Sequence, residues 1–213
     1  FGRLLKNTFM ISGLTILFGF PAPIILALMI NEVKNSAFKR TVQTITYMPY
    51  FISMVVMCGL LKTFCMQDGL FSQIAMAFGG SGQNFLANPD YFRTIYVLSD
   101  IWSGIGWNSI IYLAALSSID QEQYEAARVD GANRFKQMIH ITLPGLVPTI
   151  MVLFILRMGN ILNVGYEKIL LLYNSATYIT ADVIWRKWKP NVFKVNRDWI
   201  IQHHYQCFLP DAY

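Results

Sequence analysis

The chain has 213 residues, of which 54% are hydrophobic and only 14% are charged, and its mean hydropathy is +0.40. In soluble domains about a quarter of the residues are charged. This composition therefore excludes an ordinary soluble domain and indicates an integral membrane protein. The net charge of +5 does not indicate a nucleic-acid-binding protein, because the basic residues lie beside apolar segments, where they orient membrane proteins.

Four apolar segments are long enough to cross a bilayer as helices, which takes about 20 residues each. They are predicted at about residues 8–30, 45–64, 92–117 and 146–172. Pro21 and Pro23 predict a kink in the first segment, and Pro49 lies near the start of the second. The predicted fold class is an all-α, polytopic transmembrane helical bundle.

The loops between these segments differ in charge. Residues 31–44 and 118–144 each contain three lysines or arginines, whereas residues 67–91 contain none. Cytoplasmic loops are enriched in Lys and Arg. We therefore expect 31–44 and 118–144 to face the cytoplasm and 67–91 to face out, although Arg3 and Lys6 would then lie outside.

The loop between the third and fourth segments has the pattern of two short helices around a glycine. Asp120 can accept hydrogen bonds from the first N–H groups of a helix, and good helix formers follow over residues 121–129. Gly131 permits a positive φ and predicts a turn. A second helix is predicted over 133–139, and Pro144 is predicted to end the loop.

Two interpretations of this loop remain open from the residues alone. It can form a compact knob that fits a cleft on a soluble partner. It can also be an amphipathic hairpin on the membrane surface, with Phe135, Met138 and Ile139 in the lipid.

The loop carries a specific motif. Its pattern Glu125-Ala126-Ala127, Asp130-Gly131-Ala132 and Ile141-x-Leu143-Pro144 resembles the EAA loop of permease subunits of binding-protein-dependent ABC importers. Other stretches within residues 1–184 resemble the carbohydrate-type permeases, and are most similar to the subgroup assigned to complex polysaccharides or aldouronate-type oligosaccharides. These stretches are residues 18–23, 99–102, 111–116, 159–165 and 170–174.

The resemblance implies a type I ABC importer permease fold over residues 1–184, in a bacterial cytoplasmic membrane, with no cofactor, metal or catalytic residue. It implies four kinds of partner: a cytoplasmic ABC ATPase dimer, a second permease subunit, an extracellular or periplasmic sugar-binding protein, and an oligosaccharide substrate. ATP would be hydrolysed by the partner, since the chain has no Walker A pattern.

The resemblance also assigns roles in the loop. Glu125 would anchor it to the ATPase through a charge-assisted hydrogen bond, the alanines would allow close approach, Gly131 would form the turn and Leu143 would seat the second helix. The implied ATPase-docking residues are Glu125, Ala126, Ala127, Asp130, Gly131, Ala132, Leu143 and Pro144.

Polar and aromatic residues within the third and fourth segments are candidates for a sugar path. Arg157 lies about 11 residues into the fourth segment, near mid-membrane, where a charge normally faces protein or water. If that helix is unbroken, Arg157, Asn160 and Glu167 project to one side. The alternative is that the charged residues form structural pairs or caps and the tryptophans pack. The candidates are Asp100, Trp102, Trp107, Asn108, Arg157, Asn160 and Asn163.

Residues 185–213 depart from the family, because they are basic and polar and contain no further membrane helix. The family also has a helix before Phe1, so we expect the chain to be incomplete at both ends. A truncated, non-functional remnant is therefore one alternative function, and a secondary transporter that works without an ATPase is another. A membrane-embedded enzyme is disfavoured, because the three histidines form no nucleophile or metal-ligand pattern.

Overall fold

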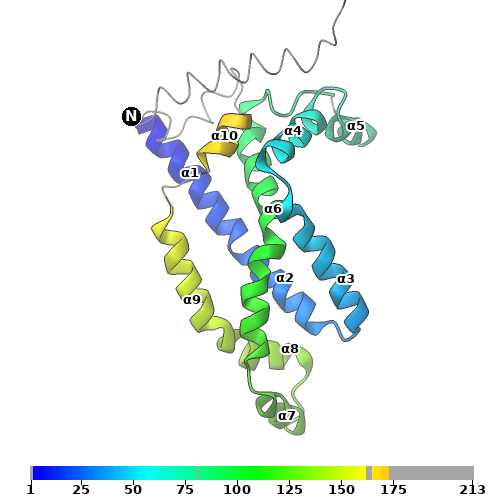
Figure 1. The fold of residues 1–213 in the computed structure, drawn as a ribbon, viewed down its shortest axis with the longest axis vertical. Helices are drawn as coiled ribbons and strands as arrows, with labels where there is room; N and C mark the ends of the chain where they lie inside the picture. Colours follow the sequence, from blue (N-terminus) through cyan, green and yellow to red (C-terminus); the bar gives the residue numbers. More distant parts are fainter. Residues whose placement is uncertain (1, 81, 162–164, 173–213) are drawn as a thin grey trace, which may run out of the picture.

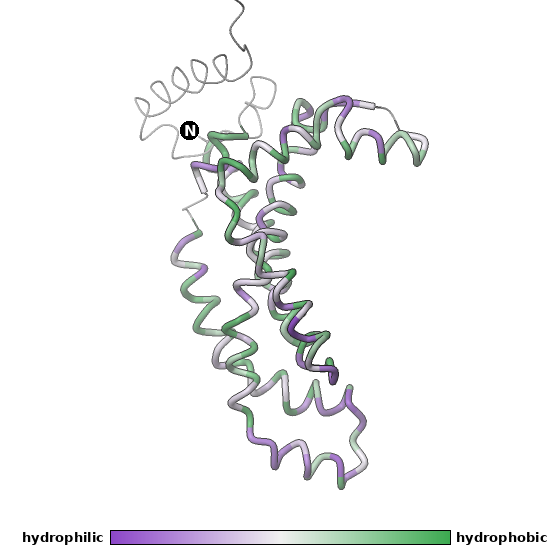
Figure 2. Tube along the Cα trace, turned by 45° about the vertical axis from the view of Figure 1, so that its right-hand side comes forward, coloured by the Kyte–Doolittle hydropathy of each residue, from purple (hydrophilic) through white to green (hydrophobic). Residues whose placement is uncertain are grey.

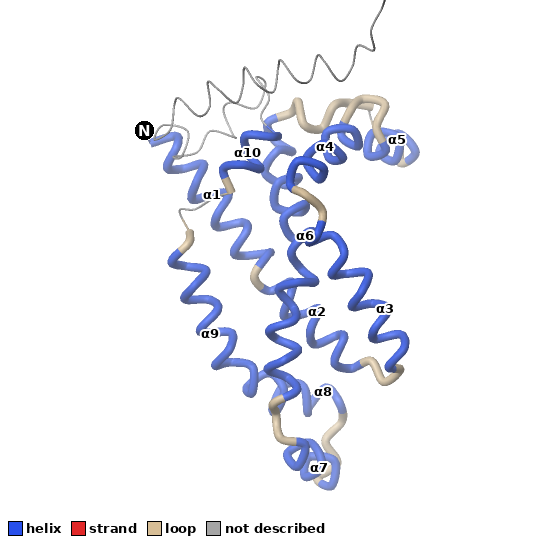
Figure 3. The backbone as a smooth tube through the Cα atoms, viewed as in Figure 1, coloured by secondary structure: helices blue, strands red, loops and turns tan. Residues whose placement is uncertain are grey.

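The computed structural model describes residues 2–80, 82–161 and 165–172, and within these ranges all regular secondary structure is helical (Figure 3). The long helices run side by side along one axis (Figure 1). Within these ranges, three helical stretches are long and apolar enough to cross a membrane: Gly2–Glu32, Met54–Ala77 and Arg134–Gly159.

The first stretch is two helices, α1 (Gly2–Gly19) and α2 (Pro21–Glu32). The predicted interruption is present at Phe20, since Pro21 has no N–H to continue the hydrogen-bond ladder and can only begin a new helix.

A loop over 31–44 and a single helix over 45–64 were predicted. The structure instead has two helices separated by a turn. Helix α3 (Ser36–Tyr47) already begins at Asn35, whose side-chain oxygen accepts the N–H groups of Ala37 and Phe38 at 3.0 and 3.2 Å. A 3₁₀ turn, η1 (Met48–Phe51), contains Pro49 and breaks the helix before α4 (Met54–Cys65) starts. Hydropathy did not reveal this break, because the residues around it are apolar.

Helix α6 (Pro89–Ser117) runs through the middle of the bundle and contacts α1, α2, α3 and α9 (Figure 1). Its 29 residues give a length of about 43 Å, enough to cross a bilayer. It carries Asp100, Ser103 and Asn108 along this length, which is compatible with a helix that faces other helices rather than lipid. Before it, α5 (Leu70–Ala77) lies beside α4 at the end of the bundle opposite α7 (Figure 1).

The prediction that Pro144 ends the polar loop is wrong. After α7 (Gln121–Val129), helix α8 (Arg134–Gln137), a π-helical turn η2 (Met138–Thr142) and α9 (Leu143–Gly159) form one uninterrupted helical stretch. Within the turn, the Leu143 N–H donates to the Met138 carbonyl five residues back. This wider turn lets the helix continue past a proline that cannot donate.

The predicted fourth segment, 146–172, is not one helix. Helix α9 ends at Gly159, where the Asn160 side chain donates to the Leu156 carbonyl, and α10 (Tyr166–Leu172) packs separately against α4. Arg157, Asn160 and Glu167 therefore do not lie along one side of a single helix. Asn163 and the tail 185–213 lie outside the described residues.

Two buried clusters hold the bundle together. One contains Ile11, Phe92 and Tyr96 at the α10 end, and the other contains Tyr112 and Leu146 toward α7. Many large apolar side chains on the long helices are exposed instead. Figure 2 shows hydrophobic residues along these helices and hydrophilic ones gathered around α7, as expected for a protein whose flanks face lipid.

Candidate functional site

Helix α7 and the turn after it protrude beyond the ends of the long helices (Figure 1). The Asp120 carboxylate accepts the Glu122 N–H at 3.0 Å, so the predicted cap is confirmed, and α7 spans the predicted residues Gln121–Val129. Gly131 has φ +73°, as its position in the pattern predicts. Its turn is closed by the Ala132 N–H, which donates to the Ala127 carbonyl at 2.9 Å.

The second short helix begins as predicted at Asn133, whose side chain accepts the Lys136 N–H at 2.9 Å. It was predicted to end at residue 139, but it continues through η2 into α9. We call α7, the Gly131 turn and α8 the knob (residues 120–137).

Two side-chain contacts attach the knob to the bundle. The Tyr124 and Thr142 hydroxyls lie 3.0 Å apart, and Arg134 lies 3.5 Å from Glu32 at the end of α2. Within the knob, the Gln137 amide donates to the Ala132 carbonyl at 2.8 Å. The knob is therefore attached to both η2 and α2.

The docking residues suggested by the motif lie on and next to the knob. Ala127 and Ala132 are half-buried, and the backbone hydrogen bond between them closes the Gly131 turn. Leu143 and Pro144 lie at the start of α9 rather than in a loop. The exposed members of the set are Glu125, Ala126, Asp130, Gly131, Leu143 and Pro144.

Two apolar side chains on the knob are also strongly exposed. Val129 is 89% exposed and Phe135 is 63% exposed. Sequence reasoning did not select Val129, and it considered Phe135 only as a lipid contact. Both residues add apolar surface to the exposed part of the knob.

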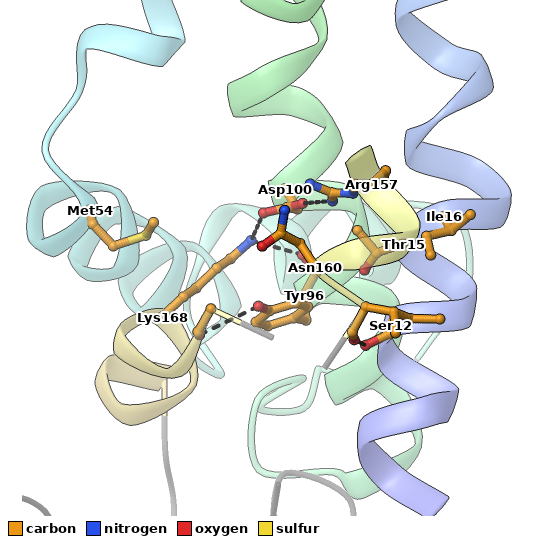
Figure 4. A pocket seen from close by; sticks show the side chains of 11 residues that line it. Ser12, Thr15, Ile16, Met54, Tyr96, Asp100, Arg157, Asn160 and Lys168 are labelled. Carbon is orange, nitrogen blue, oxygen red and sulfur yellow. Dashed lines mark hydrogen bonds and ion pairs between the residues drawn. The ribbon is translucent and has the colours of Figure 1, made fainter. Parts of the chain in front are cut away.

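A second candidate site is a polar cavity of about 240 Å³ lined by residues of α1 and α6, of the end of α9 and of α10. Asp100 on α6 lies between Lys168 and Arg157 (Figure 4). One carboxylate oxygen lies 3.5 Å from Lys168 Nζ, and the other lies 3.9 Å from a terminal guanidinium nitrogen of Arg157. The remaining lining residues are Ser12, Thr15, Ile16, Met54, Tyr96, Asn160, Ile161 and Gly165.

Lys168 was not among the predicted site residues. Its side chain is only 1% exposed, donates to the Tyr96 carbonyl at 2.9 Å and has its Nζ 4.4 Å from the centre of the Tyr96 ring. The signal that could have revealed it is a lone lysine before the apolar run Ile169–Leu172.

The structure brings only part of the predicted path together. Asp100, Arg157 and Asn160 line the polar cavity, and Asn108 joins Arg157 and Asn160 in a neighbouring cavity of about 420 Å³. Trp102 instead lines an apolar cavity between α4, α5 and α6. Trp107 stacks on Tyr50, with ring centroids 4.6 Å apart.

No group of three His, Cys, Asp or Glu side chains within residues 2–80, 82–161 and 165–172 is placed to hold a metal ion.

Residues 19–173 match the family described as the binding-protein-dependent transport system inner membrane component. The chain belongs to this permease family. The resemblance read from the EAA-like motif is thereby confirmed.

Relatives within the permease family share much of the sequence. Protein LplB of Bacillus subtilis is 46% identical over 184 residues, which cover 86% of this chain and 58% of LplB. The polygalacturonan/rhamnogalacturonan transport system permease protein YteP of the same organism is 44% identical, over 86% of this chain and 57% of YteP. The chain thus spans less than two thirds of the length of these relatives.

A solved structure of a permease-family chain confirms the fold. It belongs to a bacterial ABC transporter involved in the import of the acidic polysaccharide alginate, is 48% identical and superposes with a TM-score of 0.88. The match covers 92% of this chain and 69% of the solved one. The all-α permease fold predicted from the sequence is therefore correct.

Proposed function

We propose that this chain works as a membrane-spanning permease subunit of an ATP-driven oligosaccharide importer, and that the knob docks on a cytoplasmic ATPase. The observation that carries the proposal is the exposed helix–glycine–helix knob with the EAA-like residues on it. A secondary transporter needs no such surface, so the knob favours the importer.

The relatives support the substrate class. YteP is named for polygalacturonan and rhamnogalacturonan transport, and the solved relative imports alginate, in one structure complexed with a periplasmic protein that holds an alginate pentasaccharide. We therefore propose an oligosaccharide delivered by an extracellular or periplasmic binding protein as the substrate. A second permease subunit would complete the path.

The continuous helix from α8 to α9 gives a mechanism for coupling. Its 26 residues, about 39 Å long, begin in the knob and end beside Arg157 in the polar cavity. A movement imposed on the knob by the closing ATPase dimer would move this helix as one body. The cavity between α1, α6 and α9 would then change shape, which is what alternating access requires.

The proposal is tested with Gly131→Pro and Glu125→Lys in the full-length subunit, assembled with its partners in liposomes. Proline cannot adopt the φ of +73° at position 131, and lysine reverses the charge at 125. We expect both variants to insert into the membrane but to lose oligosaccharide uptake and substrate-stimulated ATP hydrolysis.

Gly79→Pro is the matched control. Gly79 has φ +83° and its N–H donates three residues back, as the Gly131 N–H does. It directly follows α5, the helix at the end of the bundle opposite α7. We expect this variant to retain stimulated ATP hydrolysis. Full uptake by the Gly131 and Glu125 variants would refute docking through the knob.

A further inference from the structure

The charged residues that line the polar cavity do not balance. Among the described residues that line it, Asp100 contributes one negative charge, whereas Arg157 and Lys168 contribute two positive charges. The side chains of Arg157 and Asp100 are 49% and 37% exposed, so an incoming group can reach them. The surplus of positive charge in this lining favours an anionic group.

The two cations are held differently. Lys168 is almost fully buried and is fixed by Asp100, by the Tyr96 carbonyl and by the face of the Tyr96 ring. Arg157 is 49% exposed, and its distance of 3.9 Å from Asp100 is too long for a strong hydrogen bond. Lys168 is therefore the permanent counter-ion of Asp100, and Arg157 is the cation that can exchange its partner.

Neutral polar groups stand near Arg157. Asn160 lines the same cavity, and the buried Thr15 hydroxyl has no hydrogen-bond partner among the described residues. Figure 4 shows Thr15 next to Arg157 on the side of Asp100 away from Met54, with the Asn160 side chain next to Asp100. A sugar unit whose carboxylate binds Arg157 would therefore have its hydroxyls within reach of the Asn160 amide and the Thr15 hydroxyl.

We infer that Arg157 is the residue that selects acidic sugar units, by exchanging Asp100 for a substrate carboxylate. The planar guanidinium can bind a carboxylate through two parallel hydrogen bonds, which an ammonium cannot do. Lys168 keeps Asp100 neutralised, so that Arg157 can leave it. This inference rests on the proposed function and defines the chemistry of the substrate at this site.

The test measures equilibrium binding to the assembled full-length transporter in nanodiscs, without ATP and without the binding protein. The probes are radiolabelled tetragalacturonate and its tetramethyl ester, which differ in charge but not in the sugar chain. We expect the wild type to bind the acid about tenfold more tightly than the ester, as one charge-assisted contact gives.

Each variant has its own expected result. Arg157→Gln should bind acid and ester alike, and Arg157→Lys should keep a reduced preference for the acid. Asp100→Asn should bind the acid more tightly than the wild type, because the competing carboxylate is gone. Arg40→Gln, which removes an exposed arginine from α3, should keep the wild-type preference.

The inference is overturned if the wild type shows no preference for the acid, if it binds neither probe, or if Arg157→Gln retains the preference. None of these results bears on the proposed function, which is read separately from coupled uptake and from the Gly131 variant. Conversely, a wild type that prefers the acid but shows no coupled uptake would contradict the proposed function and leave the inference about Arg157 intact.

Discussion

Single polar side chains set the helix boundaries that matter for function. Asn35, Asn88, Asp120 and Asn133 each accept a backbone N–H from the first turn of the helix that follows. Such caps typically contribute about 1 kcal/mol each. Two of them, Asp120 and Asn133, begin the two halves of the knob, so the exposed surface proposed for docking depends on short local contacts.

At this scale, Tyr124→Phe should loosen α7. The substitution removes the hydroxyl that lies 3.0 Å from the Thr142 hydroxyl, which costs about 1 kcal/mol and should speed local opening roughly fivefold. Amide hydrogen exchange of α7 measures this. Tyr50→Phe is the control, since the Tyr50 hydroxyl has no hydrogen bond within the part of the chain that the structure describes. Unchanged exchange in α7 would contradict the role given to Tyr124.

At the scale of the elements, the packing of α3 on α6 depends on a close approach at one glycine. A Cβ added to Gly106 would overlap the backbone carbonyl of Thr46, which cannot move away without displacing α3. The interruption of the helix at η1 then sets the direction in which α4 runs. Hydropathy located the apolar stretch 45–64 but gave no indication that the chain changes direction within it.

Gly106→Ala should therefore destabilise the subunit by about 1–3 kcal/mol. Gly59→Ala is the matched control, because Gly59 is also inside a helix but has no atom within 4 Å of the added Cβ. That substitution should be neutral or stabilising, because alanine favours helix more than glycine does. Melting temperatures of the detergent-purified subunit measure both effects, and equal values for the two variants would show that α3 and α6 do not pack this closely.

At the scale of the whole molecule, the bundle has two different ends. The knob and the turn between α2 and α3 lie at one end, and α5 with the segment before α6 lies at the other (Figure 1). The basic loops of the sequence fall at the knob end, so the charge bias and the arrangement of the helices agree. This places the knob on the cytoplasmic side in the proposed function.

Site-directed labelling tests this orientation. In a variant with Cys58, Cys65 and Cys207 replaced by serine, we expect Asp130→Cys to react with a membrane-impermeant maleimide only in inside-out vesicles. Asp68→Cys, also exposed but at the opposite end, should react only in right-side-out vesicles. Reaction of Asp130→Cys from outside would remove the docking role of the knob.

Features with local causes could be predicted from the amino-acid sequence. Caps, helix propensity and the φ of Gly131 act within a few residues, so the helical class and the two-part knob could be predicted from the pattern. The continuation through Pro144 could not, because it depends on a single π turn whose geometry no residue type specifies.

The composition of the polar cavity depends on how the helices pack and could not be predicted from the sequence. The cost of a charge at mid-membrane predicts that Arg157 faces protein or water but does not say which residue it meets. Asp100, Arg157 and Lys168 come together because α9 ends at Gly159 and α10 packs against α4 instead of extending α9. These contacts join residues far apart in the sequence, and such contacts are fixed by the packing of whole helices rather than by any local preference.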